Sequence, residues 1–390
     1  MTLEQLAVTV AVLGALGLVA GRFGLSAIPA YLLAGLLLGP NELRELSFIE
    51  PSEVTTFVAE LGIIFLLFFL GLEFTLARLL RSGRHLGLGG SIDLLVNAAL
   101  GLLVGIAAFG FSFAAVLLAA GIYVSSSAVA VKGLIDFRRL ADDETDLVLA
   151  ILVFEDIAIA GVLALSSTSG TEVNPTLGAV AKALIFITVA LAISRVGARL
   201  LDRILDRLPG EFFLLFTFAF VVAAAAVAQG LGLSEAIGAL MAGVVLADTS
   251  VREEIEERFL AFRDVFAALF FFVFGLSIDV AALRDIGWLV ALAVVFSVVG
   301  KLASGFGAGT VGGLSPRQSL NVGAALVAHG EFTVIIAELA SRNEAIPGSD
   351  RADLVAFAGL YVLLTATLGV VLMKESKRLG RTLFPHPRLE

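Results

Sequence analysis

The sequence contains no cysteine and only three histidines among its 390 residues. The absence of cysteine excludes disulfides, thiol catalysis and cysteine-ligated metal, and three scattered histidines disfavour a zinc centre. Charge is also sparse, because Asp, Glu, Lys and Arg make up 16% of the chain, whereas about 25% is usual in soluble domains. Since no constellation of nucleophile, base and metal ligands is present, we expect neither an enzyme nor a cofactor.

Apolar residues account for 59% of the chain, and the mean hydropathy is +1.01. This composition indicates an all-helical integral membrane protein whose surroundings are a lipid bilayer, with no nucleic-acid partner. The apolar runs are continuous rather than alternating, so helices and not a barrel are expected. A helix needs about 20 mostly apolar residues to cross the bilayer. Thirteen candidate spans follow, of which the second and ninth are short: 3–20, 27–39, 54–73, 85–110, 112–136, 144–167, 175–203, 211–229, 234–248, 260–278, 283–311, 316–340 and 352–374.

Basic residues separate onto one side of these spans. Twenty of the 26 fall in the segments on the side of the C-terminus, and four fall on the other side, at Arg44, Arg284, Arg342 and Arg351. Because cytoplasmic loops carry the excess of Lys and Arg, we expect the N-terminus outside and the C-terminus in the cytoplasm. No basic residue or cleavage site marks the first span as a signal peptide, so it is interpreted as a retained helix.

Two short motifs recur seven spans apart. Residues 68–74 (FFLGLEF) resemble 272–279 (FVFGLSID), and residues 34–38 (AGLLL) resemble 242–246 (AGVVL). An odd displacement turns one copy upside down, which is the inverted-topology repeat of secondary transporters. The alternative is that such strings recur by chance in apolar helices, but two pairs at nearly the same offset disfavour it. The expected divisions are a first repeat at 1–174, a linker span at 175–210, a second repeat at 211–375 and a short basic tail at 376–390.

The same offset relates two polar interruptions in the middles of spans five and twelve. Serine returns hydrogen bonds to the backbone and glycine loosens a helix, so both spans are predicted to be discontinuous, with half-helix ends available to an ion. The alternative is that the serines are small residues for tight packing. The candidate residues are Ser125, Ser126 and Ser127 in span five and His329, Gly330 and Glu331 in span twelve.

Glu155 and Asp156 stand in the middle of span six. Ionisable groups at this depth cost at least about 2.5–3.5 kcal/mol, which makes them functional candidates. Adjacent helical residues point about 100° apart, so the two acids should have different jobs. A buried carboxylate is stabilised by either a proton or a cation, and that competition is the chemistry of cation/proton exchange.

Lys301 is central in span eleven and is the natural partner for one of the two acids. The alternative for Lys301 is that its side chain extends to the cytoplasmic interface. Glu331 is interpreted as a second acid or as a stabiliser of the helix break, and Asp93 inside span four is a further candidate.

Several short motifs together resemble one transporter family. These are residues 125–128 (SSSA), Lys132, residues 144–146 (ETD), 154–157 (FEDI), 274–279 (FGLSID) and 330–332 (GEF). They resemble the monovalent cation:proton antiporter family that includes the Kef potassium-efflux systems, and most closely its Kht-type potassium/proton antiporter branch. The resemblance covers essentially the whole chain.

The resemblance implies that Asp156 binds the proton and the monovalent cation in turn, with crossover-helix ligands from the Ser125 to Ser127 region. Lys301 would neutralise the acid beside Asp156. Glu155 departs from the pattern, because many sodium/proton relatives have Asp or Asn there and Kef has Gln, which bears on stoichiometry and ion choice. The implied fold has a core of spans four to six and eleven to thirteen, and a dimerisation panel of spans one to three and eight to ten. A homodimer in the bacterial inner membrane is the implied assembly.

Many Kef relatives continue into a nucleotide-binding domain after the last span, but this sequence has a short basic tail and no Gly-x-Gly-x-x-Gly there. Either a separate cytoplasmic subunit would supply regulation, or a regulatory domain has been removed. The expected function is exchange of cytoplasmic K+ for H+ by alternating access. The alternatives are a Na+/H+ antiporter of the same fold, a ligand-gated cation channel and a non-transporting receptor.

Overall fold

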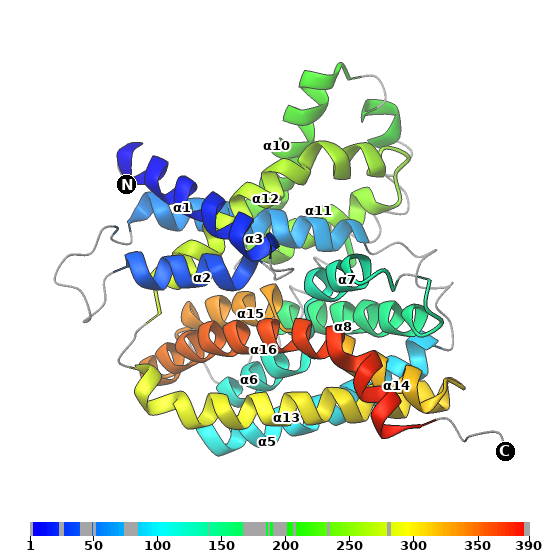
Figure 1. Ribbon diagram of the computed structural model, residues 1–390. Coiled ribbons are helices and arrows are strands. Elements are labelled where there is room, and N and C mark those ends of the chain that lie inside the picture. The colour runs from blue at the N-terminus through cyan, green and yellow to red at the C-terminus, as the bar shows by residue number, and fades with distance from the viewer. Residues whose placement is uncertain are drawn as a thin grey trace.

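The computed structural model describes residues 3–22, 27–39, 49, 52–73, 85–139, 141–166, 185, 188–189, 201–205, 208–231, 235–278 and 282–385. Regular structure in these residues is exclusively helical (Figure 1). The predicted seventh span, 175–203, lies almost wholly outside them. Phe74 and Asp279, which end the two copies of one repeated motif, also lie outside the described residues.

Nine helical segments in the described part of the chain are long and apolar enough to cross a membrane, and α2 and α11 are shorter apolar helices. These two shorter helices are the second and ninth spans that the sequence predicted to be short. The helices are α1 (Leu3–Arg22), α2 (Ala27–Leu38), α3 (Glu53–Glu73), the π-helix η1 (His85–Gly89), α5 (Gly90–Phe109), α6 (Phe113–Tyr123), α7 (Ser127–Asp136), α8 (Thr145–Ser166), α10 (Gly210–Gly230), α11 (Glu235–Ala247), α12 (Arg252–Leu276), α13 (Ala282–Val311), α14 (Pro316–Leu326), α15 (Glu331–Ser341) and α16 (Gly348–Leu383).

The helices pack as two bundles, which lie above and below each other in Figure 1. In the first, α3 packs against α11 and α12, α2 packs against α12 and α1, and α10 packs against α11. We call this group the panel bundle. In the second, the core bundle, α13 packs against α5, α14 and α16, while α15 packs against α6 and α16. The core bundle also contains η1, α7 and α8.

Two pairs of glycines bring helices of the panel bundle into close contact. Gly35 of α2 faces Gly275 of α12, and a Cβ on either would collide with the other helix's backbone. Gly71 of α3 faces Gly243 of α11 in the same way. Residues without a side chain allow two helix backbones to approach closely within a membrane. All four glycines belong to the repeated sequence motifs, so these motifs form both crossings.

Both predicted helix interruptions are present, and they cross each other inside the core bundle. The first helix interruption lies between α6 and α7, and the second lies between α14 and α15. Ser126 caps α7, because its Oγ accepts a hydrogen bond from the backbone N–H of Val129 at 3.3 Å. The Ser126 N–H donates to the carbonyl oxygen of Ala328 at 2.7 Å, which ties the two breaks together.

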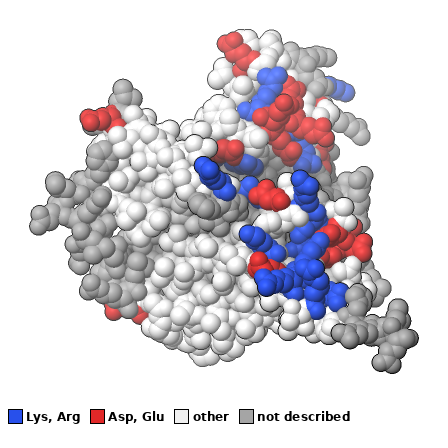
Figure 2. Space-filling view, viewed as in Figure 1, with Lys and Arg blue, Asp and Glu red and all other residues white. Residues whose placement is uncertain are grey.

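Charged side chains gather at one end of the molecule, on the right of Figure 2, while most of the visible surface elsewhere is uncharged. We call this the basic end. It includes α7, which carries the Lys132–Asp136 ion pair, and the last turns of α16, where Lys377 pairs with Asp142. In Figure 1, α15 extends from the crossing away from the basic end, and α16 then returns toward it. The two half-helices α7 and α15 therefore point from the crossing to opposite ends of the molecule.

Candidate functional site

Glu155 and Asp156 are consecutive in α8, and both are almost completely buried, with 0% and 4% of their surface exposed. Their side chains leave the helix about 100° apart. As the helical geometry predicted, the two carboxylates have different neighbours. One is enclosed by polar partners, and the other lines a cavity.

Glu155 is held by a lysine from another helix and by a serine from the interruption between α6 and α7. The ammonium of Lys301, on α13, lies 2.7 Å from Glu155 Oε1. Ser125 donates two hydrogen bonds to this carboxylate, one from its backbone N–H and one from its Oγ at 3.0 Å. Lys301 has no exposed surface, so its side chain does not extend to an interface.

Lys301 has a second acidic partner. Asp93 of α5 accepts from Lys301 Nζ at 2.8 Å. The other oxygen of Asp93 accepts from Ser304 Oγ at 2.7 Å and from Asn97 Nδ2 at 2.8 Å. We call Asp93, Glu155 and Lys301 the buried ion network. A buried ion pair is stable only when its remaining hydrogen-bonding capacity is satisfied, and Ser125, Ser304 and Asn97 provide that here.

Asn97 and Ser304 were not identified from the sequence. Asn97 is four residues after Asp93, and Ser304 is three residues after Lys301, so each shares a helix face with a charged residue. That spacing is the signal that would have identified them. The pairing itself joins α5 to α13 across more than 200 residues of sequence, and no local pattern indicates it.

Asp156 faces a cavity of about 880 Å³ between the two bundles. Ser127 Oγ lies 3.3 Å from Asp156 Oδ2, and both residues line the cavity together with Glu331. The cavity also reaches Lys132 and Asp264, whose side chains are 49% and 60% exposed. It therefore connects the middle of α8 with the basic end.

Glu331 is the first residue of α15 and accepts a hydrogen bond from Ser126 Oγ at 2.8 Å. A carboxylate is favourable at a helix N-terminus, where backbone N–H groups carry partial positive charge. Ser127 similarly begins α7. The cavity therefore combines two half-helix N-termini with the carboxylates of Asp156 and Glu331. Hydroxyl and carboxylate oxygens are ligands suited to a hard monovalent cation.

His329 and Gly330 hold the crossing rather than line the cavity. The ring nitrogens of His329 lie 2.8 Å from the carbonyl oxygen of Val327 and 2.7 Å from that of Ile122. Tyr361 OH lies 3.1 Å from His329 Nε2. A Cβ at Gly330 would collide with the Ser126 side chain, so the close approach requires glycine.

The sequence-predicted residues thus fall into three groups. Asp156, Ser127 and Glu331 line the cavity, Glu155, Ser125 and Lys301 belong to or bind the buried ion network, and Ser126, His329 and Gly330 join the two breaks. The structure therefore does not place the side chains of all three serines at one binding site. Thr333 and Tyr361, which brace the crossing, were missed because only the folded chain brings them to their partners.

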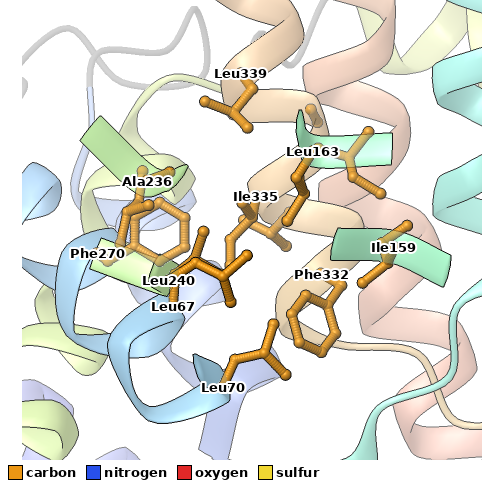
Figure 3. Close-up of a cluster of buried hydrophobic side chains, with 14 of the residues drawn as sticks. Leu67, Leu70, Ile159, Leu163, Ala236, Leu240, Phe270, Phe332, Ile335 and Leu339 are labelled. Atoms are coloured by element: carbon orange, nitrogen blue, oxygen red, sulfur yellow. The ribbon is translucent and has the colours of Figure 1, made fainter. Parts of the chain in front are cut away.

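Buried apolar side chains of both bundles pack together (Figure 3), and three of them, Leu70, Phe332 and Ile335, also line the cavity. Ile159 and Leu163 follow Asp156 along α8, and Ile335 and Leu339 follow Glu331 along α15. Residues of the panel bundle face them. We call the set the apolar seal, and it comprises Leu67, Leu70, Ile159, Leu163, Ala236, Leu240, Phe270, Phe332, Ile335 and Leu339. Among the described residues, Asp156 is therefore reached through the cavity from the basic end, while the apolar seal fills the space between the two bundles on the other side.

Residues 8–374 match the family model described as sodium/hydrogen exchanger, transmembrane. The chain belongs to this family. It is 39% identical over 374 residues to the K(+)/H(+) antiporter subunit KhtU of Bacillus subtilis, covering 94% of this chain and 91% of KhtU. It is 29% identical over 369 residues to the ammonium/H(+) antiporter subunit AmhT of Alkalihalophilus pseudofirmus, covering 92% and 89%.

The fold of this sodium/hydrogen exchanger family member also matches a solved structure. The sodium proton antiporter MjNhaP1 of Methanocaldococcus jannaschii at pH 8 superimposes with a TM-score of 0.70 at 17% identity, covering 98% of this chain and 100% of that one. A second MjNhaP1 structure gives a TM-score of 0.64 with full coverage of both chains. The resemblance to monovalent cation:proton antiporters is confirmed. The protein is a multi-pass membrane cation/proton antiporter, a transporter rather than an enzyme.

Proposed function

We propose that the protein exchanges cytoplasmic K+ for external H+ by alternating access, with Asp156 holding the cation and the proton in turn. The observation that carries this proposal is the cavity, which reaches Asp156 from the basic end while Glu155, the neighbouring acid, is neutralised by Lys301. The similarity to KhtU, a K(+)/H(+) antiporter subunit, and to AmhT, an ammonium/H(+) antiporter subunit, favours K+ over Na+.

In this cycle, deprotonated Asp156 attracts K+ into the cavity, and oxygens of Ser127 and Glu331 replace part of the ion's water shell. A carboxylate that holds K+ is a poor proton acceptor, and a protonated one is a poor cation ligand. Rearrangement of the core bundle against the panel bundle then opens the apolar seal and closes the cavity. On the other side of the membrane, a proton displaces K+ from Asp156. The reverse rearrangement then brings the protonated Asp156 back to face the basic end. Lys301 compensates the charge of Glu155 throughout the cycle.

Alternating access in secondary transporters rests on inverted repeats. The two glycine crossings support such a repeat here. Exchanging the repeated motifs replaces Gly35 by Gly243 and Gly275 by Gly71, so the α2–α12 contact becomes the α11–α3 contact. The proposed repeats are 1–174 and 211–375, with 175–210 as the linker and 376–390 as a tail.

The basic end is proposed to face the cytoplasm, by the positive-inside rule. The N-terminus would then lie outside, and the membrane would be the bacterial inner membrane. A homodimer through the panel bundle is the proposed assembly. The word subunit in the KhtU name supports a separate cytoplasmic regulatory subunit.

Proteoliposomes with a trapped pH indicator test this function. Addition of K+, Na+ or NH4+ to vesicles containing the native protein should move protons most strongly with K+, and Asp156→Asn should abolish the response. Asp350→Asn, the same chemical change at a half-buried site in the first turn of α16 where Ser349 is a hydrogen-bond partner, is the control and should transport normally. Full exchange by Asp156→Asn would refute the role of Asp156, and a larger response to Na+ than to K+ would refute the ion assignment.

A further inference from the structure

Arg342 lies directly after α15 and contacts three carboxylates from three helices. Its Nη1 lies 3.2 Å from Glu60 Oε1 on α3 and 3.0 Å from Glu235 Oε1 on α11. Its Nε lies 3.1 Å from Glu338 Oε1, one turn earlier on α15 itself. One guanidinium therefore joins the core bundle, through α15, to two helices of the panel bundle.

This cluster stands beyond the apolar seal, at the end opposite the cavity mouth. Along α15 the order is Glu331 in the cavity, then Ile335 and Leu339 in the seal, then Arg342. In Figure 1, α15 and the start of α16 lie away from the basic end. Arg342 thus bridges the two bundles where an outward opening would have to begin.

The three ion pairs would respond differently to a movement of α15 relative to α3 and α11. The contacts with Glu60 and Glu235 join different bundles and must lengthen when that end opens. The contact with Glu338 lies within the α15 segment, at a spacing of four residues, and persists in either state. Arg342 is therefore never left without an acidic partner, which lowers the cost of releasing the other two.

The pairs are also weak enough to be reversible. The Arg342 side chain is 33% exposed, and those of Glu60 and Glu235 are 32% and 15% exposed. Ion pairs with this access to water contribute little individually and are screened by salt. Such a cluster biases an equilibrium between two states without blocking it.

We propose that Arg342 is a reversible latch, which holds the end opposite the cavity closed by binding Glu60 and Glu235, and which transfers fully to Glu338 when that end opens. Arg342 is a positioning residue, since it touches neither Asp156 nor the cavity. The latch rests on the proposed alternating access but not on the choice of ion. It gives the antiporter a resting preference for the state in which Asp156 is reached from the basic end.

The chain has no cysteine, so one introduced thiol reports exposure without background. Leu163 in the apolar seal has no exposed surface, and in a Leu163→Cys background a membrane-impermeant maleimide is applied from the side of Arg342. The double variant Glu60→Gln/Glu235→Gln should be labelled faster, on the order of 3–10-fold, because two weak pairs are lost. Glu338→Gln is the matched control, which removes only the pair within α15, and it should not be labelled faster.

Raising the salt concentration on that side should accelerate labelling of the native background and have less effect on the double variant. Unchanged labelling of the double variant, or equal acceleration by Glu338→Gln, would overturn the latch. Thermal unfolding of each variant shows whether a faster rate reflects opening rather than loss of structure. Because labelling measures exposure and not transport, failure of the proton-flux experiment with K+ would leave this result interpretable.

Discussion

Glu155 and Asp156 are neighbours in the chain and in the membrane, but the regions that receive their side chains differ in construction. Glu155 belongs to the buried ion network, where Lys301 and Asp93 have no exposed surface and Lys301 Nζ lies 2.8 Å from Asp93 and 2.7 Å from Glu155. Asp156 lines a cavity in which Ser127 is 3.3 Å away and exposed residues line the far end. The buried ion network is shielded from solvent, whereas Asp156 is reached from solvent through the cavity.

This difference distinguishes charged groups that stabilise the fold from the charged group that takes part in transport. Breaking a buried ion pair on one side leaves an uncompensated charge, so such a group cannot change partners during a transport cycle without a large cost. A carboxylate beside a cavity can exchange a proton for a cation, because both reach it through the same opening. Burial alone therefore does not identify the transporting residue.

The largest effect is expected from removing the lysine of the network. Lys301→Met leaves Asp93 and Glu155 facing each other without a cation, and the free energy of unfolding should fall by about 3–5 kcal/mol. Thermal unfolding in detergent measures this. The double variant Lys301→Met/Glu155→Gln should recover part of the loss. Asp156→Asn should unfold close to the native temperature, and an equal loss there would erase the distinction between the two regions.

A smaller loss of stability is expected from the serine that binds Glu155. Ser125→Ala removes the Oγ that lies 2.7 Å from the Leu326 carbonyl oxygen and 3.0 Å from Glu155 Oε1, but keeps the hydrogen bond from its backbone N–H to Glu155. Hydrogen bonds to charged groups contribute about 1.5–3 kcal/mol, and the lower value is expected because Lys301 remains. Denaturant or thermal unfolding measures the difference. A stability equal to that of the native protein would show that the hydroxyl is dispensable to the network.

Acidification should weaken apparent cation affinity. If protons and K+ compete for Asp156 alone, lowering the pH on the basic side raises the KM for K+, by up to about tenfold per pH unit, without changing the maximal rate at saturating K+. Initial rates in proteoliposomes over a range of K+ concentrations measure both quantities. A KM that does not change with pH would mean that the proton and the cation bind at different groups.

The smallest effect is expected from the serine of the cavity. Ser127→Ala removes one oxygen near Asp156 and should raise the KM for K+ by about threefold, because water in the cavity replaces the hydroxyl. Unfolding should not change, in contrast to Ser125→Ala. The pair of variants compares two adjacent regions with one kind of substitution. A loss of stability in Ser127→Ala, with an unchanged KM, would reverse the assignment of the two serines.

The sequence predicted those parts of the site that depend on helix geometry. The breaks at residues 124–126 and 327–330 were identified from polar residues within apolar spans, and different surroundings for Glu155 and Asp156 followed from their adjacency. A partner for Lys301 was expected among these two acids, but the sharing with Asp93 was not, because nothing local relates residue 93 to residue 301.

Neither the apolar seal nor the Arg342 cluster could be predicted from the sequence. The seal combines helices of both bundles, and any apolar helix face is compatible with it. Arg342 was counted among the few basic residues of the loops opposite the basic end, and two of its three acidic partners, Glu60 and Glu235, come from distant segments of the chain. Contacts between distant segments require the packed structure.

The central claim is that one carboxylate, Asp156, holds either the cation or the proton. Proton release on cation binding tests it most directly. When K+ is added to the purified protein in weak buffer, at a pH low enough that Asp156 carries a proton before K+ binds, the native protein should release about one proton per K+ bound, and Asp156→Asn should release none. Binding of K+ to the native protein without proton release, or equal release by Asp156→Asn, would contradict the account.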